Sequence, residues 1–200
     1  MYELKFAKTY DFAIMIKNNI SHVIEDAFVA EKDFFCVADG VTRERIDGKV
    51  FKYPETLEEA KDLVENYPNP SGSSKAANTC VDSFKEFVSN SDNISEKVLL
   101  DAAKYANKNI AELNRNMKID YVQNDYFCCE AVGGVIVDNI LYCFGIGDCS
   151  IQLLDDDYNV VFNTVPTTQA LSVLKYKPSF ILSSIYKNKW NWSNAKMEDL

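Results

Sequence analysis

The stretch Phe34-Phe35-Cys36-Val37-Ala38-Asp39-Gly40 decides how the fold is read. Its apolar run is short and stops at an Asp-Gly pair, which predicts a buried strand that ends in a turn. Residues 27–38 and residues 11–17 both carry strand-like apolar runs. A carboxylate at a strand end can point into a shared cleft while the strand holds it still. Glu25-Asp26 and Gly147-Asp148 repeat this arrangement at the ends of two other apolar runs.

Between these acidic positions the sequence predicts three helices. A capping box at Thr56–Glu59 begins a short helix, which we interpret as an insert at about 54–68. A longer amphipathic helix is expected from Ser73, and another over about 95–114. The apolar face of the helix from Ser73 consists of Ala77, Cys80, Val81, Phe84 and Val88.

After residue 126 the pattern changes to strands. Residues 132–146 predict a hairpin whose two-residue turn is Asp138-Asn139. Residues 150–163 predict a second hairpin around an acidic turn. Strands, then helices, then antiparallel strands predict a single α+β domain rather than a parallel α/β sheet.

Composition narrows the class of protein. The 200 residues carry a net charge of −9, which argues against a nucleic-acid partner, because such proteins usually present a basic patch. No apolar run approaches the roughly 20 residues that span a bilayer, and the first residues lack the layout of a signal peptide. We therefore expect no membrane partner and a cytoplasmic protein. Six cysteines without a CxxC pair, and a single histidine, exclude the usual zinc patterns. We expect cysteines that stay reduced and act as small hydrophobes, and His22 at the surface.

The last residues form a segment of mixed character. Residues 175–192 combine four lysines with five aromatic residues, a mixture that can bind nucleic acid. Because the chain as a whole is acidic, we favour a half-covered surface instead. Ser193 and the residues after it are typical of a helix start, so we expect a domain whose C-terminal part lies beyond Leu200.

The acidic strand ends suggest a site for a hard cation. Mg²⁺ and Mn²⁺ prefer carboxylate, carbonyl and water oxygens as ligands. Gly40 suits such a site, because a glycine lets a backbone carbonyl come close to an ion. The alternative is that these positions are plain turns, which favour Asp and Gly for conformational reasons. Spacing alone leaves both interpretations open.

The order of the motifs resembles the metal-dependent protein phosphatases of the PPM type, the type-2C serine/threonine phosphatases. Ile24–Phe28 is similar to the family's "ED-A" strand, and Phe35–Gly40 to its "F-x-V-x-D-G" strand. Ser71–Ala77 falls where the family begins its first long helix. Glu130–Val137 and Leu141–Ser150 are similar to the "G-(S/T)-T-A" and "L-x-x-A-x-x-G-D-S-R" strands. The resemblance covers roughly residues 10–165.

The resemblance implies a fold and a chemistry. The fold would be two packed antiparallel sheets flanked by helices, an α-β-β-α sandwich. Two Mg²⁺ or Mn²⁺ ions would bind, with Asp39 bridging them and with Glu25 and the Gly40 carbonyl holding one of them. Asp148 matches an aspartate linked to a third, weaker ion. A metal-activated water would hydrolyse phosphoserine or phosphothreonine in a protein substrate, so that Asp39 and Glu25 serve catalysis as metal ligands.

Several positions depart from the family's pattern. Ser21 stands where the family has a phosphate-binding arginine, and Arg43 or Arg45 could take over that role. Cys128-Cys129-Glu130 replaces a small-residue motif, and the later "S-D-G" and "D-N" motifs, which supply further metal aspartates, are not found in these 200 residues. Three hypotheses therefore remain. The protein is a phosphatase, a catalytically impaired scaffold or regulatory binding domain of the same fold, or an unrelated α+β protein with acidic turns. The oligomeric state is left open.

Overall fold

The protein is an α+β structure, as the order of its motifs predicts. The computed structural model describes residues 13–41, 45–46, 49–50, 53–117 and 127–164. It divides into two units, Met1–Phe144 and Gly145–Leu200, and each is described by itself. The expected helical tail and the 175–192 segment lie outside the described residues. Among the described residues, no helix is long and apolar enough to cross a membrane.

A four-stranded sheet organises the first unit. Its order is β1 (Ala27–Ala30), β2 (Phe34–Gly40), β5 (Cys129–Val137) and β6 (Ile140–Ile146). Strand β2 pairs antiparallel with both β1 and β5 and is therefore a central strand. Strands β5 and β6 form the predicted hairpin, and the predicted turn residues Asp138 and Asn139 adopt φ values of 50° and 63°. A two-stranded ribbon, β3 (Arg45–Ile46) and β4 (Lys49–Val50), is separate from this sheet.

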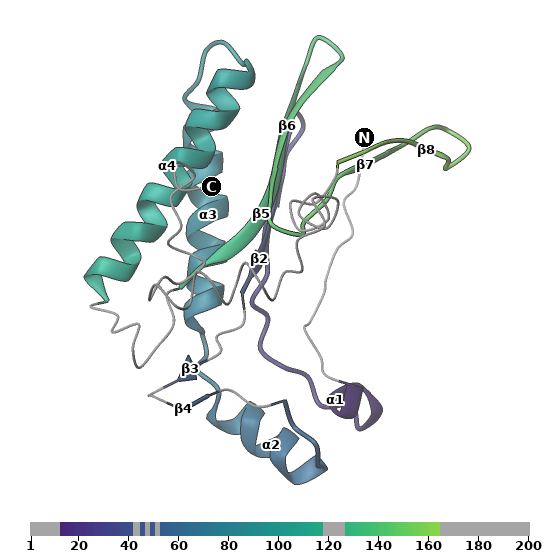
Figure 1. The fold of residues 1–200 in the computed structure, drawn as a ribbon. Coiled ribbons are helices and arrows are strands. Elements are labelled where there is room, and N and C mark those ends of the chain that lie inside the picture. Colours follow the sequence, from purple (N-terminus) through teal and green to yellow (C-terminus); the bar gives the residue numbers. More distant parts are fainter. Residues whose placement is uncertain (1–12, 42–44, 47–48, 51–52, 118–126, 165–200) are drawn as a thin grey trace, which may run out of the picture. The chain divides into compact units, whose positions relative to one another are not determined.

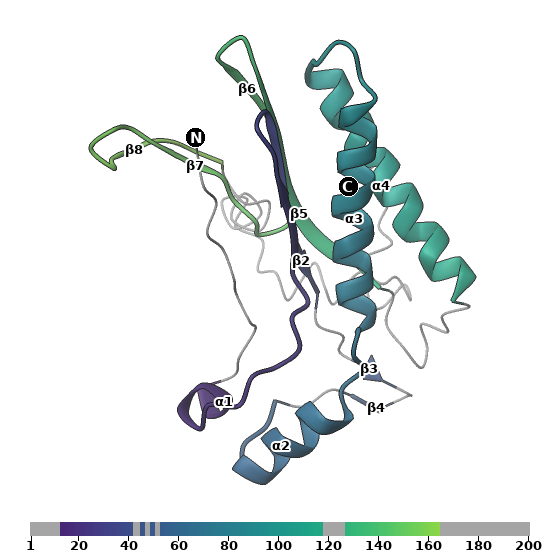
Figure 2. The same cartoon turned by 180° about the vertical axis from the view of Figure 1, so that it is seen from behind.

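Two long helices cover one face of the sheet (Figures 1 and 2). Helix α3 (Gly72–Ser89) packs on β1, β2 and β5, and α4 (Glu96–Asn116) packs on α3. Each begins at a serine N-cap, Ser71 or Ser95, whose side chain accepts a hydrogen bond from a backbone N–H three residues on. The predicted apolar face of α3 is confirmed, because Ala77, Cys80, Val81, Phe84 and Val88 are all buried.

The alternation of side chains along β2 explains why one face carries the core. Cys36, Ala38 and Gly40 are buried, whereas the residues between them are only half-buried. Successive residues of a strand point to opposite faces, so the buried set faces α3. Phe84 of α3 is fully buried and lies 6.4 Å from the Phe34 ring and 5.5 Å from the Phe144 ring, centroid to centroid.

Two of the predicted local structures are wrong. Residues 13–17 form a short helix, α1 (Ala13–Lys17), and not a strand. An apolar run by itself does not reveal its period, and here Asn18 and Asn19 end a helix. The Asn18 side chain donates to the Ile14 carbonyl at 2.8 Å, and Asn19 takes the left-handed conformation common at helix ends, with φ 55°.

The second error concerns Asp39-Gly40, which is not a turn. The strand continues through both residues, because Asp39 pairs with Glu130 and Gly40 pairs with Cys129 of β5. Ladder pairing to a neighbouring strand thus overrides the local preference of Asp and Gly for a turn.

The helix predicted at about 54–68 and the second predicted hairpin are confirmed. Helix α2 (Leu57–Asn66) carries the complete capping box between Thr56 and Glu59. In the second unit, β7 (Gln152–Leu154) and β8 (Val160–Asn163) form the predicted second hairpin. Asp155 organises its turn: its carboxylate accepts hydrogen bonds from the backbone N–H groups of Asn159 and Asp157, at 2.8 and 2.9 Å. The hydrogen bonds from Asn159 are the main cause of a lowered pKa at Asp155, and the hydrogen bond from Asp157 contributes less.

Gly40→Ala tests how tightly β2 approaches α3. A Cβ at this position would lie 2.5 Å from the Glu25 carbonyl oxygen and 2.8 Å from backbone atoms of Ser73, and backbone cannot step aside. We expect a loss of about 1–3 kcal/mol in the free energy of unfolding, measured by urea titration. Gly133→Ala is the matched control, since its nearest neighbours are the ring edges of Phe144 and Phe84, which can shift. An equal or larger loss in the control would contradict this account.

Candidate metal site

Three carboxylates lie in one row across the sheet of the first unit. Asp39 on β2 is paired directly with Glu130 on β5. On its other side, the β1–β2 register pairs Ala27 with Ala38, so Asp26, one residue before β1, lies opposite Asp39. Directly opposed residues on neighbouring strands point to the same face, with Cβ atoms about 4.5–5.5 Å apart. Asp39 is thus the middle member of the row.

This row lies on the face of the sheet opposite α3. Gly40, next to Asp39, faces the helix, and alternation along the strand turns Asp39 the other way. All three carboxylates are half-buried. Carboxylate oxygens are the ligands that hard divalent cations prefer, so the row is a candidate cation site.

Glu25, which the resemblance predicts as a metal ligand, is buried at the start of β1. Its side chain is 2% exposed and accepts hydrogen bonds from the Tyr67 hydroxyl, at 3.0 Å, and from the Ser71 hydroxyl. Tyr67 is the C-cap of α2 and Ser71 the N-cap of α3. Glu25 therefore joins the start of β1 to the α2–α3 junction, whereas its neighbour Asp26 belongs to the opposite face. Of the predicted carboxylate ligands on this sheet, Asp39 lies in the row, whereas the Glu25 carboxylate lies on the helix side.

Gly40 acts as the contact point between the sheet and α3. The position of its missing Cβ is filled by the Glu25 carbonyl oxygen and the Ser73 backbone. The next residue, Val41, accepts a hydrogen bond at its carbonyl from the Ser73 hydroxyl. The glycine thus has a packing reason to be here, in addition to the predicted approach of its carbonyl to an ion, which stays a prediction.

His22 is buried, and the expectation of a surface histidine is wrong. It is 3% exposed, and its ring packs edge-on against Tyr67 with centroids 4.4 Å apart. Its Nδ1 lies 3.0 Å from the Val23 carbonyl oxygen. The polar surroundings of His22 in the sequence concealed this contact, because Tyr67 is 45 residues away in the chain.

The cysteines beside the row behave as core side chains. All six cysteines lie among the described residues and none forms a disulfide, and Cys36 and Cys80 are buried, as predicted. Cys129, which pairs with Gly40, shares a hydrogen bond with the Cys80 thiol. This hydrogen bond, together with burial, raises the pKa of Cys129 above the usual range of a thiol. Strand alternation also places Cys129 on the helix side of β5, away from the face that carries Glu130.

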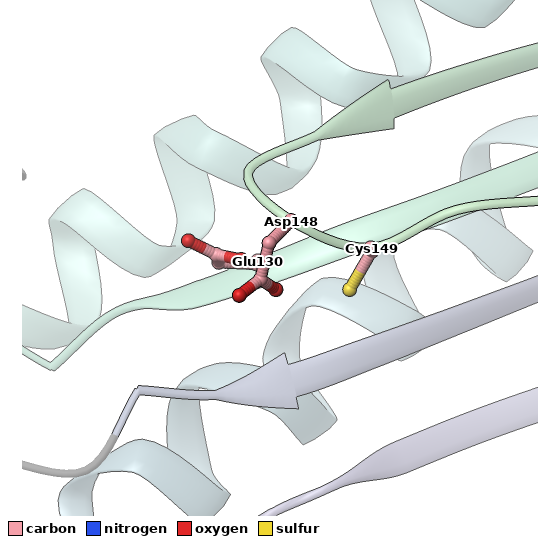
Figure 3. A group of neighbouring side chains, drawn as sticks. All are labelled: Glu130, Asp148 and Cys149. Atoms are coloured by element: carbon pink, nitrogen blue, oxygen red, sulfur yellow. The ribbon is translucent and has the colours of Figure 1, made fainter. Parts of the chain in front are cut away.

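The remaining predicted site residues are Asp148 and Arg43. Asp148 belongs to the second unit, where it is exposed in the turn after β6, next to Cys149 (Figure 3). The same figure labels Glu130 on its strand. Arg43, the predicted phosphate ligand, lies outside the described residues, as does the side chain of Arg45. Their assigned roles remain predictions.

Sequence reasoning overlooked two members of the row. Asp26 was visible as the second half of the Glu25-Asp26 pair, and strand alternation could have shown that only one of the two faces the same way as Asp39. Glu130 carried no such signal, because its place opposite Asp39 depends on the β2–β5 register.

A scan of protein-family models and a search of curated proteins both find no match to this chain.

Tyr67→Phe tests whether Glu25 anchors the α2–α3 junction. The substitution keeps the ring against His22 but leaves a buried carboxylate with one donor fewer. We expect a loss of about 1 kcal/mol or more in the free energy of unfolding. Tyr158→Phe removes a hydroxyl from a side chain that is 84% exposed and should change stability by less than about 0.5 kcal/mol. Equal effects of the two substitutions would show that the Tyr67 hydroxyl does not support Glu25.

Proposed function

We propose that this protein is a Mg²⁺- or Mn²⁺-dependent phosphatase acting on phosphoserine or phosphothreonine in proteins. The observation that carries the proposal is the row formed by Asp26, Asp39 and Glu130. It supplies acidic ligands at the strand, "F-x-V-x-D-G", that most resembles the PPM phosphatases. A cytoplasmic location fits a chain whose six cysteines, all among the described residues, form no disulfide.

The chemistry of the row fits a hard divalent cation. Its side chains offer only carboxylate oxygens, which Mg²⁺ and Mn²⁺ prefer over sulfur or imidazole ligands. Asp39 has a carboxylate on either side, so Asp26, Asp39 and Glu130 together would hold the ions.

The residues of the chain have distinct tasks in this proposal. Asp39 would be the central metal ligand, and its pairing with Glu130 on the neighbouring strand fixes its backbone. Asp26 and Glu130 would complete the ligand set. Glu25 holds the start of β1 through Ser71 and Tyr67, and so keeps Asp26 level with Asp39. Bound divalent ions would activate a water and stabilise the charge that develops on the phosphoryl oxygens.

The face that bears the row also supports the finer prediction of a two-sheet sandwich. Phe28 and Ile136 lie on this face, and they are 46% and 49% exposed. Apolar residues on a sheet face are usually covered by a second layer. A second sheet packed here would place the carboxylate row between two layers, where water access is limited.

A second candidate function is a metal-binding regulatory or scaffold domain without catalysis. The observation that favours it is the engagement of Glu25 by two hydroxyl groups on the helix side of the sheet. If Glu25 is needed as a ligand, its absence from the row would weaken the binding of one ion. Binding and hydrolysis are therefore tested separately.

Asp39→Asn should remove a metal-induced gain in thermal stability if the row binds an ion. With millimolar Mn²⁺, the wild type should gain roughly 5 °C, because the ion binds only the folded state, and the variant should gain little. Differential scanning calorimetry measures both.

Asp92→Asn serves as the control for this experiment. Asp92 is an exposed loop residue between α3 and α4, and its substitution removes the same charge away from the row. It should leave the Mn²⁺-induced gain unchanged. Loss of the gain in both variants would mean that Mn²⁺ binds through overall charge. Loss of the gain in Glu25→Gln would instead support the predicted ligand role of Glu25.

Hydrolysis of p-nitrophenyl phosphate with Mn²⁺ separates the enzyme from the scaffold. The wild type should hydrolyse it and stop when EDTA is added, and Asp39→Asn should lower kcat/KM by about 100-fold or more, because the ions stabilise several kcal/mol of transition-state charge. Glu25→Gln should fall by less than about tenfold if Glu25 acts through position. Mn²⁺ binding without hydrolysis would favour the scaffold.

A further inference from the structure

The C-terminal end of α3 and the facing part of α4 border a small surface cavity that is open to solvent. Its volume is about 250 Å³, and its lining is Glu86, Phe87, Asn90, Ser91 and Tyr105. Glu86 follows Ser73 by 13 residues of one helix, which separates the cavity from Gly40 by roughly 20 Å at 1.5 Å per residue. Sites for whole small molecules hold about 300–1,000 Å³, so this cavity suits a single side chain.

Two aromatic rings and one carboxylate meet in this cavity. The rings of Phe87 and Tyr105 come from different helices, with centroids 5.6 Å apart and planes tilted by 45°. The Tyr105 hydroxyl donates a hydrogen bond to Glu86 Oε2 at 3.1 Å and so holds the carboxylate beside the rings. The faces of aromatic rings attract cations, and a carboxylate within reach adds a direct partner for the charge.

The end of α3 adds negative potential to the same place. The last turn of α3 contains no basic residue. Its carbonyls at Glu86 and Phe87 accept hydrogen bonds from the neutral side chains of Asn90 and Ser91, each at 2.8 Å. These bonds satisfy the carbonyls but bring no positive charge to the C-terminal end of the helix dipole. Lys85, one residue before Glu86, is paired with Glu31 at 2.6 Å.

We propose that this cavity binds the guanidinium group of an arginine presented by a partner protein. A guanidinium is planar, so it can lie against an aromatic ring while its N–H groups bond to the Glu86 carboxylate. An ammonium group can use the charge but not the flat contact. The net charge of −9 favours a basic partner. The inference is independent of the metal site.

A blocked pentapeptide with one arginine between glycines is a direct probe. Titrated to millimolar concentration against ¹⁵N-labelled protein, it should shift the amide signals of Phe87, Asn90, Ser91 and Tyr105. The same peptide with citrulline, which is neutral and nearly identical in shape, should bind about tenfold more weakly. The lysine peptide should bind a few-fold more weakly than the arginine peptide. Equal binding of arginine and citrulline peptides, or no shift at these residues, would overturn the proposal.

Variants locate the binding on the protein. Glu86→Gln removes the charge at an exposed position and should weaken arginine binding about tenfold. Tyr105→Phe keeps the ring but releases the carboxylate, and should weaken binding two- to threefold. Glu65→Gln removes an exposed charge on α2 and should change binding by less than twofold. Equal losses in Glu86→Gln and Glu65→Gln would show binding by general charge and overturn the assignment.

Discussion

The close approach of β2 to the start of α3 is the contact on which the first unit depends. Gly40 makes it possible, because a side chain there would collide with the Glu25 carbonyl oxygen and with the Ser73 backbone. The Ser73 hydroxyl then bonds to the Val41 carbonyl, and the Ser71 hydroxyl bonds to the Glu25 carboxylate. Two strands and one helix are thus held together within a few residues. Any displacement of this contact would change the level at which Asp26 and Asp39 face each other.

Strand alternation gives the two sides of this contact different work. Glu25 and Gly40 belong to the helix side, where burial and hydrogen bonds hold the backbone. Asp26 follows Glu25 by one residue, and Asp39 precedes Gly40 by one residue. Both therefore belong to the opposite face. The adjacent pair Glu25-Asp26 is consequently split into a structural carboxylate and a carboxylate of the row. The same backbone that fixes the packing also fixes the positions of the acidic side chains.

Much of the fold was accessible from sequence because it depends on local signals. The serine N-caps, the capping box at Thr56 and the Asp138-Asn139 turn are each encoded within a few residues, and the structure contains them. The errors arose where distant residues decide. Asp39-Gly40 has the composition of a turn but is a strand, because β5, some 90 residues later, pairs with it. The burial of Glu25 needs Tyr67 and Ser71, and the place of Glu130 needs the β2–β5 register, neither of which a single sequence reveals.

Helix α3 runs from the buried Glu25 carboxylate to the cavity that holds Glu86. Its N-terminal end, positive through the helix dipole, lies beside the buried Glu25 carboxylate, which Ser71 and Tyr67 also stabilise. A carboxylate without such donors would be costly at this depth. The C-terminal end of α3 is negative, has no basic residue in its last turn, and borders the cavity that holds Glu86. At one end the helix meets an anion from its own chain. At the other end its negative potential matches the proposed cationic partner. The direction of one helix is therefore consistent with both the buried Glu25 carboxylate and the chemistry of that proposed partner.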